Sequence, residues 1–257
     1  ALASEGNIPY DQLMEIRDPK NPENDAGVRI LNCDGSEAQA CGNGMRCVVA
    51  YLNAQDQKLD YKIATRAGLL TTTYQDADNI TVDMGKPNLG WEQIPTTEEF
   101  SDTSKVELQI GPIDAPVLHS PSLANMGNPH AIFWVEAPVE SYDLHLFGPL
   151  LENHPIFPEK ANITIAQVIN GEHINIRTWE RAAGLTLACG SAACATLVSA
   201  IRTGRLNEGV RKATITVPSG KNLIIEWLEN NHVLMSGPAE FEFFGQFDRD
   251  TGEWKKD

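Results

Sequence analysis

The sequence predicts a mixed α+β fold built from two similar halves. Short β-rich runs occur along the whole chain, separated by clusters of Gly, Pro, Asn and Asp. Only two segments are strongly helical, and a similar cysteine motif precedes each of them: "QACGNGMRC" at 39–47 and "LACGSAACA" at 187–195. We therefore expect an internal duplication, in which each half is a β-rich layer around one buried helix.

The β-rich runs are rich in Val, Ile, Thr and aromatic residues, which favour strands. We expect strands at 61–65, 79–84, 106–110, 130–135, 163–169, 173–179, 213–217 and 223–227. In "HINIRTW" at 173–179, the alternation places Ile174 and Ile176 on one face and Asn175 and Arg177 on the other. We expect Arg177 to be solvated.

The two helices differ in how much of their surface is apolar. In the first, Met45, Val48, Val49 and Leu52 have the spacing of one helical face. The second, 191–201, has no polar face before Arg202, which is typical of a helix buried on all sides, and Gly204 is expected to end it. Asn43 and Ser191 are expected to be the N-cap residues, two positions after Cys41 and Cys189.

We expect the halves to be residues 1–115, with Cys41, and 116–257, with Cys189, and the chain ends to cross between them. The polar segment "MGNPHA" at 126–131 begins roughly 60 residues before Cys189, so its counterpart in the first half would precede residue 1. The sequence thus predicts a further N-terminal segment.

The composition excludes several classes of partner. Twenty Lys and Arg against 35 Asp and Glu give a net charge of −15, which repels nucleic acid and anionic membranes. Apolar runs such as 131–135 are too short to span a bilayer. Five cysteines, without any C-x-x-C pair, argue against a disulfide framework and against a metal site. A soluble protein in the reducing cytoplasm is expected, with Cys33, Cys47 and Cys194 as packing residues.

The remaining cysteines, Cys41 and Cys189, suggest acid–base chemistry. The free N–H groups and partial positive charge of a helix N-terminus lower a thiol pKa and bind a carboxylate. Two such thiols on opposite sides of a substrate would invert a stereocentre, because one removes the α-proton while the other delivers a proton from behind. A Cys/His hydrolase needs one nucleophile and one base and gives no reason for the repeat.

Four separated motifs, "LNCDGSEAQACGNGMRC", "MGNPHA", "EKANI" and "TWERAAGLTLACGSAACA", resemble the diaminopimelate epimerase family. These enzymes interconvert the LL and meso forms of diaminopimelate without a cofactor, in the synthesis of lysine and peptidoglycan precursors. The resemblance implies two pseudo-symmetric domains with barrel-like sheets around a central helix, an active site in the cleft between them, and a homodimer. It also implies that Cys41 and Cys189 are the acid–base pair and that His130 and Glu180 tune the thiols.

The resemblance implies substrate contacts at the same motif positions. Asn32, Asn162 and Arg181 would hold the distal amino acid end of diaminopimelate, where an Arg can fork onto a carboxylate. Gln12 and Asn128 would add amide hydrogen bonds. Gly42, Asn43, Gly190 and Ser191 would direct helix-end N–H groups at the α-carboxylate.

The chain departs from the family pattern at two points. Ala182 replaces a usual Gly, which would cost about 1 kcal/mol if the backbone there has positive φ. The early Gly-Asn-Asp-Phe segment of the family is not found. Two alternatives stay open: a two-thiol racemase of the proline racemase type, against which Asn43 and Arg181 argue, and an inactive amino-acid-binding homologue. Asp34 and Glu37 are interpreted as turn residues.

Overall fold

The computed structural model describes residues 10, 12–32, 35–38, 41–248, 251 and 253–257. Cys33 and Asp34 lie outside the described residues. The chain forms two compact units: unit 1 comprises residues 1–82 and 237–257, and unit 2 comprises residues 83–236. The C-terminal segment therefore returns to unit 1. This division differs from the boundary expected near residue 115, because residues 83–115 pack into the core of unit 2 through Ile94, Val106 and Leu108.

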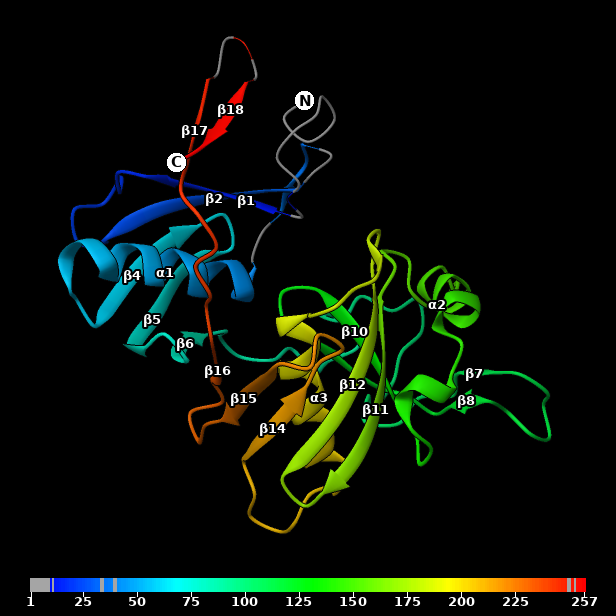
Figure 1. Cartoon of the computed structure of the whole chain (residues 1–257). Helices are drawn as coiled ribbons and strands as arrows, with labels where there is room; N and C mark the ends of the chain where they lie inside the picture. The colour runs from blue at the N-terminus through cyan, green and yellow to red at the C-terminus, as the bar shows by residue number, and fades with distance from the viewer. Residues whose placement is uncertain (1–9, 11, 33–34, 39–40, 249–250, 252) are drawn as a thin grey trace. The chain divides into compact units, whose positions relative to one another are not determined.

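Unit 1 contains one sheet, one long helix and a C-terminal hairpin (Figure 1). The sheet has the strand order β1-β2-β4-β5-β6, and β3 pairs with β2. Helix α1 contacts β1 and β5. The elements are β1 (Gln12–Arg17), β2 (Ala26–Asn32), β3 (Glu37–Ala38), α1 (Gly42–Asp56), β4 (Asp60–Thr65), β5 (Gly68–Asp76), β6 (Asn79–Asp83), β17 (Gly245–Phe247) and β18 (Trp254–Lys256).

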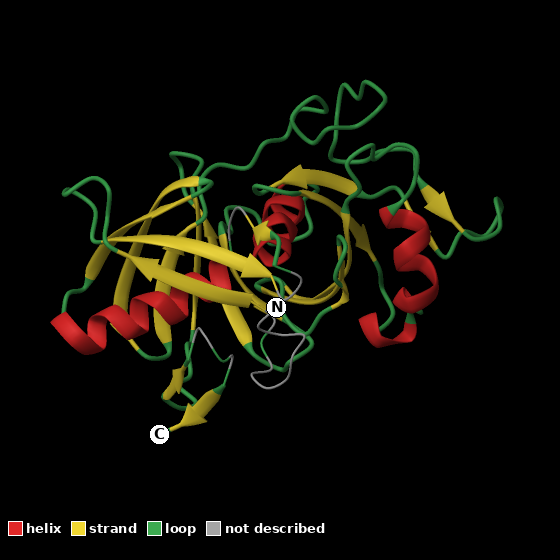
Figure 2. Cartoon of the chain, turned by 90° about the horizontal axis from the view of Figure 1, so that it is seen from above, coloured by secondary structure: helices red, strands yellow, loops and turns green. Residues whose placement is uncertain are grey.

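Unit 2 contains a longer curved sheet with the strand order β16-β15-β14-β12-β11-β10-β9, and β13 pairs with β12. The elements are β7 (Gln109–Ile110), β8 (Leu118–His119), β9 (Ser122–Asn125), β10 (Pro129–Trp134), the 3-10 turn η1 (Val139–Ser141), α2 (Leu144–Glu152), β11 (Asn162–Asn170), β12 (His173–Glu180), β13 (Gly184–Leu185), α3 (Gly190–Arg202), β14 (Lys212–Thr216), β15 (Asn222–Trp227) and β16 (Val233–Gly237). Helix α3 contacts β9, β10, β11, β14 and β15, and Figure 2 shows the sheet curving around it.

The two units share one topology, which supports the duplication inferred from the cysteine motifs. In unit 1, β1, β2 and β3 pair in antiparallel order, α1 follows, and β4 then pairs parallel to β2 and leads into the antiparallel strands β5 and β6. In unit 2, β11, β12, β13, α3, β14, β15 and β16 repeat that order and those directions. Strand β10 has no counterpart in the described part of unit 1.

The two faces of the unit 2 sheet carry different side chains. On β10, Ala131 and Phe133 belong to an apolar core on the face that α2 covers. Trp134 lies on the opposite face, where its Nε1–H donates to Ser199 Oγ of α3 at 2.9 Å. Because side chains alternate along a strand, His130 also lies on the α3 face.

The same alternation orients β11 and β12. Asn162 pairs with His130 across the sheet, and the Thr164 and Thr178 hydroxyls bond each other at 3.1 Å. Thr178 and Glu180 therefore lie on the α3 face, whereas Trp179 lies on the α2 face. The sheet thus gathers polar side chains beside α3.

Most of the expected strands are present, and the longest alternating runs are placed best. The segment expected at 106–110 forms only the two-residue strand β7, while β1, β2, β5, β9, β16 and α2 were not predicted. Arg177, expected to be solvated, is half-buried, and its Nη1 donates to Val139 O and Tyr142 O at 3.2 and 3.1 Å. Cys194 is buried as expected, but Cys47 is exposed.

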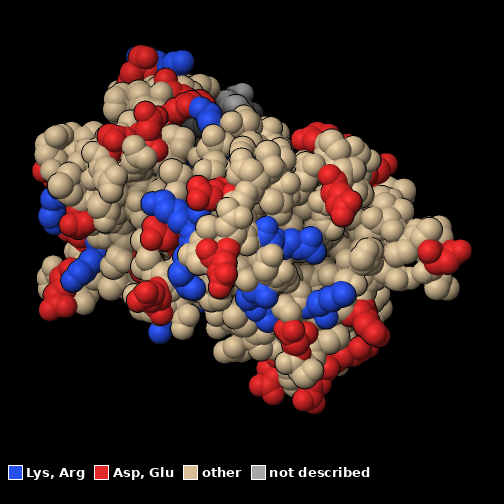
Figure 3. Space-filling model, turned by 90° about the horizontal axis from the view of Figure 1, so that it is seen from below, with Lys and Arg blue, Asp and Glu red and all other residues tan. Residues whose placement is uncertain are grey.

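Among the described residues, no helix is long and apolar enough to cross a membrane. The face drawn in Figure 3 shows Asp and Glu side chains lying among the Lys and Arg side chains, rather than a continuous basic surface. The full sequence carries a net charge of −15.

Candidate active site

Cys41 is itself the N-cap of α1. Its backbone is extended, with φ −148° and ψ 101°, and its Sγ accepts the Gly44 N–H at 3.3 Å. A Cβ at position 44 would lie 2.2 Å from Cε of Met14, so a side chain there would require the end of the Met14 side chain to move. The glycine in "CGNG" therefore leaves room for the Met14 side chain of β1 beside the first turn of the helix.

Cys189 is the N-cap of α3 and is 6% exposed. Its carbonyl accepts the Ala193 N–H at 3.1 Å, and its Sγ lies 3.5 Å from Ser191 Oγ. The expectation that Asn43 and Ser191 are the caps was wrong: the caps lie two residues earlier, at Cys41 and Cys189, and the helices begin at Gly42 and Gly190. Each thiol is consequently closer to the helix end than the sequence predicted.

The electrostatic prediction for Cys189 also needs correction. Burial and the neighbouring Glu180 carboxylate raise the pKa of the Cys189 thiol well above its ordinary value, although the Ser191 side chain and the Ala192 N–H act in the opposite direction. The helix N-terminus alone was expected to lower this pKa. The buried thiol beside a carboxylate is thus protonated at neutral pH.

His130 is fully buried on β10. Its Nε2 lies 2.8 Å from Asn128 Oδ1, and its Nδ1 has no hydrogen-bond partner among the residues that the structure describes. Burial, together with the Arg181 guanidinium, lowers the pKa of His130 to about 3. The imidazole is therefore neutral at physiological pH.

Glu180 and Arg181 stand at the end of β12, in a turn with several anchors. The Thr186 hydroxyl donates to Glu180 Oε1 at 2.5 Å. The Arg181 N–H donates to Asn162 Oδ1 at 2.8 Å, and Arg181 Nη1 donates to Glu159 O at 3.0 Å. Asn162 is 1% exposed, and its Nδ2 donates to Pro129 O, so it ties β10, β11 and this turn together.

The remaining predicted residues lie in unit 1. Gln12 and Asn32 are paired across β1 and β2, and Gln12 Nε2 donates to Asn32 Oδ1 at 2.9 Å. Asn43 lies in the first turn of α1, where its Oδ1 accepts Arg46 Nη1 at 3.1 Å.

The structure thus gathers the predicted residues into two groups, each within one unit. Unit 1 holds Gln12, Asn32, Cys41, Gly42 and Asn43, whereas unit 2 holds Asn128, His130, Asn162, Glu180, Arg181, Cys189, Gly190 and Ser191.

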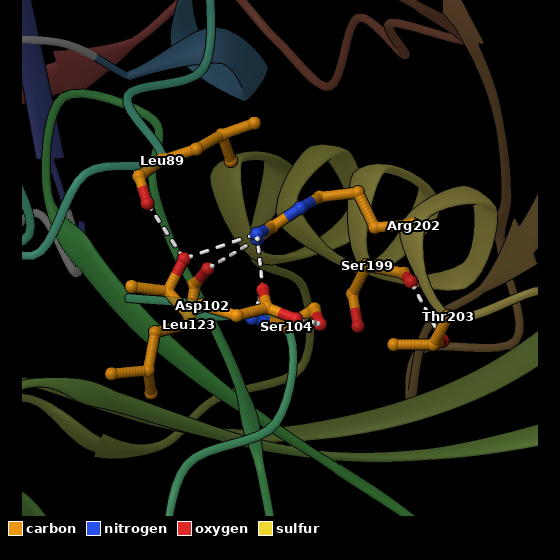
Figure 4. A network of polar contacts seen from close by, with 8 residues as sticks. Leu89, Asp102, Ser104, Leu123, Ser199, Arg202 and Thr203 are labelled. Carbon is orange, nitrogen blue, oxygen red and sulfur yellow. Dashed lines mark hydrogen bonds and ion pairs between the residues drawn. The ribbon is translucent and has the colours of Figure 1, made fainter. Parts of the chain in front are cut away.

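Helix α3, which carries Cys189, is fixed at its far end by Arg202. The guanidinium donates to Leu123 O, Thr103 Oγ1 and Asp102 Oδ1 at 3.2, 3.1 and 3.3 Å, as Figure 4 shows in part. Thr103 Oγ1 in turn donates to Leu89 O at 2.6 Å. The helix is therefore tied to β9 and to the loop before β7.

The helix then ends as the sequence predicted. Gly204 follows with φ 63°, and the N–H groups of Gly204 and Arg205 bond Ile201 O and Ala200 O, a Schellman motif. Cys189 accordingly sits on a rigid element.

Sequence reasoning did not find Thr186 or Glu152. Thr186 lies within the motif "TWERAAGLTLACGSAACA", but nothing in the pattern marks its hydroxyl as a donor to Glu180. Glu152 lies in α2, whose Gly148 and Pro149 obscure the helical pattern. Among the described residues, no group of three or more His, Cys, Asp or Glu could hold a metal ion.

Comparison with known proteins decides the family. The family model described as diaminopimelate epimerase matches residues 11–90 and 122–242. This chain belongs to the diaminopimelate epimerase family. The resemblance seen in the four motifs is thereby confirmed.

Curated relatives extend the match over the whole chain. Diaminopimelate epimerases of Brucella canis and Brucella anthropi are each 58% identical over 256 residues, which is 100% of this chain and 83% and 84% of the relatives, respectively.

Solved structures show the same two-domain fold at low identity. A hydroxyproline epimerase of Agrobacterium vitis has a TM-score of 0.62 and 16% identity over 90% of this chain and 74% of that one. A PhzF-family phenazine biosynthesis protein of Bacillus anthracis has a TM-score of 0.59 and 14% identity over 89% and 82%. The expected mixed α+β fold is confirmed.

Proposed function

We propose that this chain is an isomerase that epimerises diaminopimelate, interconverting its LL and meso forms at one α-carbon in lysine and peptidoglycan precursor synthesis. Membership of the diaminopimelate epimerase family carries this proposal. The presence of a thiol at the same topological position of both units, as the N-cap of α1 and of α3, supports it. Duplicated groups suit a reaction that runs in both directions.

In the proposed mechanism, Cys41 and Cys189 act on the same carbon. When Cys41 is the base, its thiolate takes the α-proton and the Cys189 thiol gives a proton to the other face. The raised pKa of Cys189, caused by burial and by Glu180, suits a proton donor. In the reverse direction Cys189 must lose its proton, a change that the Glu180 carboxylate opposes and that the Ser191 side chain and the Ala192 N–H favour, since these two lower the pKa of the thiol.

The substrate's charged ends match groups on both helices. The first-turn N–H groups at Gly42 and Asn43, and at Gly190 and Ser191, would bind the α-carboxylate and stabilise the charge that develops as the proton leaves. Arg181, with Asn32, Asn162, Asn128 and Gln12, would hold the distal amino acid end. His130 stays neutral and would orient the site without adding charge.

We further propose that the working enzyme is a homodimer in the cytoplasm. A reducing compartment would keep Cys41 and Cys189 as thiols, which is how both are found here. Both proton-transfer groups of the proposed scheme, Cys41 and Cys189, belong to the same chain, so each protomer would contain a complete acid–base pair.

Isotope exchange tests the proposed function. The protein is incubated in D2O with LL-diaminopimelate, and in parallel with proline, and the α-deuterium content is followed by mass spectrometry. Deuterium in diaminopimelate together with formation of the meso isomer is expected. Exchange into proline alone would favour the two-thiol racemase, and exchange into neither substrate would leave an amino-acid-binding protein.

A further inference from the structure

Glu152, the last residue of α2, is a buried carboxylate outside the proposed mechanism. It is 5% exposed, yet it accepts from three segments of the chain. Trp179 Nε1–H donates to Oε2 at 2.7 Å, the Ala182 N–H donates to Oε1 at 3.1 Å, and Lys160 Nζ lies 3.5 Å from Oε1. A carboxylate is costly to bury unless donors surround it, so this arrangement is a specific one.

The carboxylate of Glu152 is ionised at neutral pH. Burial raises its pKa, but the Trp179 indole, the Ala182 N–H and Lys160 outweigh burial and bring the pKa below its ordinary value. An ionised carboxylate accepts at both oxygens, which allows one side chain to hold both Trp179 and Ala182.

Gly148 shows that α2 is shaped around Trp179. A Cβ at position 148 would lie 2.5 Å from Cγ and Cδ2 of the indole, closer than any side chain could approach. Gly148 and Glu152 are four residues apart and therefore share one helical face. On that face the Trp179 indole ring packs against Gly148, and its N–H donates to Glu152.

Trp179 and Glu180 are consecutive on β12 and point to opposite faces of the sheet. Holding the indole against α2 therefore fixes where the Glu180 side chain leaves the strand on the α3 side. The Ala182 N–H provides a second fixed point, just beyond Arg181, whose own N–H is held by Asn162. Glu152 thus holds the chain on both sides of the Glu180–Arg181 pair.

We propose that Glu152 is a positioning residue for Glu180 and Arg181. It sets the backbone of the 180–184 turn through Trp179 and Ala182, and so sets the distance from Glu180 to Cys189 and the direction of the Arg181 side chain. The proposal rests on the proposed epimerase function for its kinetic consequence, but not for its structural one.

The test uses Glu152→Gln, which keeps the shape of the side chain. The amide end of Gln is a donor, so either the indole N–H or the Ala182 N–H loses its acceptor. We expect kcat/KM for LL-diaminopimelate to fall about 10- to 100-fold, because small displacements of catalytic groups are costly. In the substrate-free protein, hydrogen exchange of the Ala182 amide should become at least about tenfold faster.

Three further variants separate positioning from general loss of stability. Trp179→Phe removes the indole N–H together with part of the ring and should lower kcat/KM several-fold. Lys160→Met removes an ion pair whose lysine is exposed, and it should leave kcat/KM and Ala182 exchange within about twofold, because both hydrogen bonds to Glu152 remain. Leu151→Val loosens the same turn of α2 in the apolar core. It should lower the stability while leaving kcat/KM of the folded protein and Ala182 exchange unchanged.

Several results would overturn the proposal. The first is a Glu152→Gln variant with the kcat/KM or the Ala182 amide exchange of the wild-type protein. The second is a Leu151→Val variant that loses as much kcat/KM, and gains as much Ala182 exchange, as Glu152→Gln. If Glu152→Gln does not fold, wild-type behaviour of Trp179→Phe would overturn it. If the wild-type protein does not epimerise diaminopimelate, the proposed function fails, whereas the exchange measurement still decides whether Glu152 holds the turn.

Discussion

Ala182 has φ 62°, in the left-handed region that favours glycine. The sequence predicts an energetic cost for Ala at this position if the backbone has positive φ, and the structure shows that φ is positive. We expect Ala182→Gly to raise the free energy of unfolding by up to about 1 kcal/mol, because relief of the strained φ outweighs the added flexibility of the unfolded chain. Urea unfolding measures the change.

Its matched control is Ala183→Gly in the same exposed turn, where φ is not positive. This variant should be destabilised by about 0.5 to 1 kcal/mol. Equal effects at the two positions would contradict the assignment of strain to residue 182.

Thr186 orients Glu180 through one hydrogen bond of 2.5 Å. We expect Thr186→Val, which keeps the shape but loses the hydroxyl, to lower kcat about tenfold, with KM for diaminopimelate within about twofold. Thr186→Ser should restore most of the activity, since it keeps the donor. Equal activity of the Val and Ser variants would show that the hydroxyl is not used.

His130 gives the protein a specific acid sensitivity. Its pKa is about 3 in the folded state, because of burial and Arg181, and about 6.5 in the unfolded state. The unfolded state therefore binds the proton more tightly, and the stability supplied by the neutral imidazole is complete above pH 6.5 and declines as the pH falls toward 3.

Between pH 6.5 and 5.0, this group should reduce the free energy of unfolding by about 1.5 to 2 kcal/mol. Urea unfolding at the two pH values measures it. His130→Asn, which does not titrate, should lose that part of the dependence, and an unchanged dependence would contradict the account.

At the scale of elements, helix α3 is the support for Cys189. Arg202 has a side chain that is 17% exposed, and it bonds β9 and the loop before β7 at the far end of the helix. We expect Arg202→Met to lower the free energy of unfolding by about 1.5 to 3 kcal/mol, because charged hydrogen bonds are lost and the acceptors at Leu123 and Thr103 stay buried.

Arg205→Met is the matched control three residues later. Arg205 lies over the Trp134 ring at 5.1 Å, an exposed cation–π contact worth about 0.5 to 1 kcal/mol. A loss in Arg205→Met as large as that in Arg202→Met would argue against the anchoring role of Arg202.

The elements show why sequence reasoning succeeded in some places. Strands β10, β11, β12, β14 and β15 have clear apolar patterning, and α3 is apolar on every side, so their positions follow from burial alone. The caps were misplaced because side-chain preference favours Asn and Ser, whereas here Gly42 and Gly190 start the helices.

The rest of the site depends on contacts that no local pattern encodes. Glu152 reaches Trp179 and Ala182 across 27 and 30 residues, and Arg202 reaches Thr103 across 99. The raised pKa of Cys189 follows from its burial beside Glu180, which the sequence could place near the thiol only through the family resemblance.

At the scale of the molecule, the duplication is the central feature. Both units repeat one order of strands around one helix, and each helix begins at a cysteine. Cys41 Sγ accepts a backbone N–H, whereas Cys189 is a buried thiol with a raised pKa. The two cysteines therefore occupy equivalent positions in the duplication but differ in their surroundings. The proposed reversible proton exchange needs both thiols.

The central claim is that two thiols act on one carbon. It is tested most directly by the deuterium content of the product and of the unreacted substrate early in the reaction. LL-diaminopimelate is converted in D2O for less than a tenth of its course, with wild-type protein and with Cys41→Ala and Cys189→Ala, and both isomers are analysed by mass spectrometry. Two thiols acting on one carbon predict meso product with one α-deuterium, an almost unlabelled LL pool, and no turnover in either variant. Deuterium entering the LL pool as fast as the product, or turnover in either variant, would contradict it.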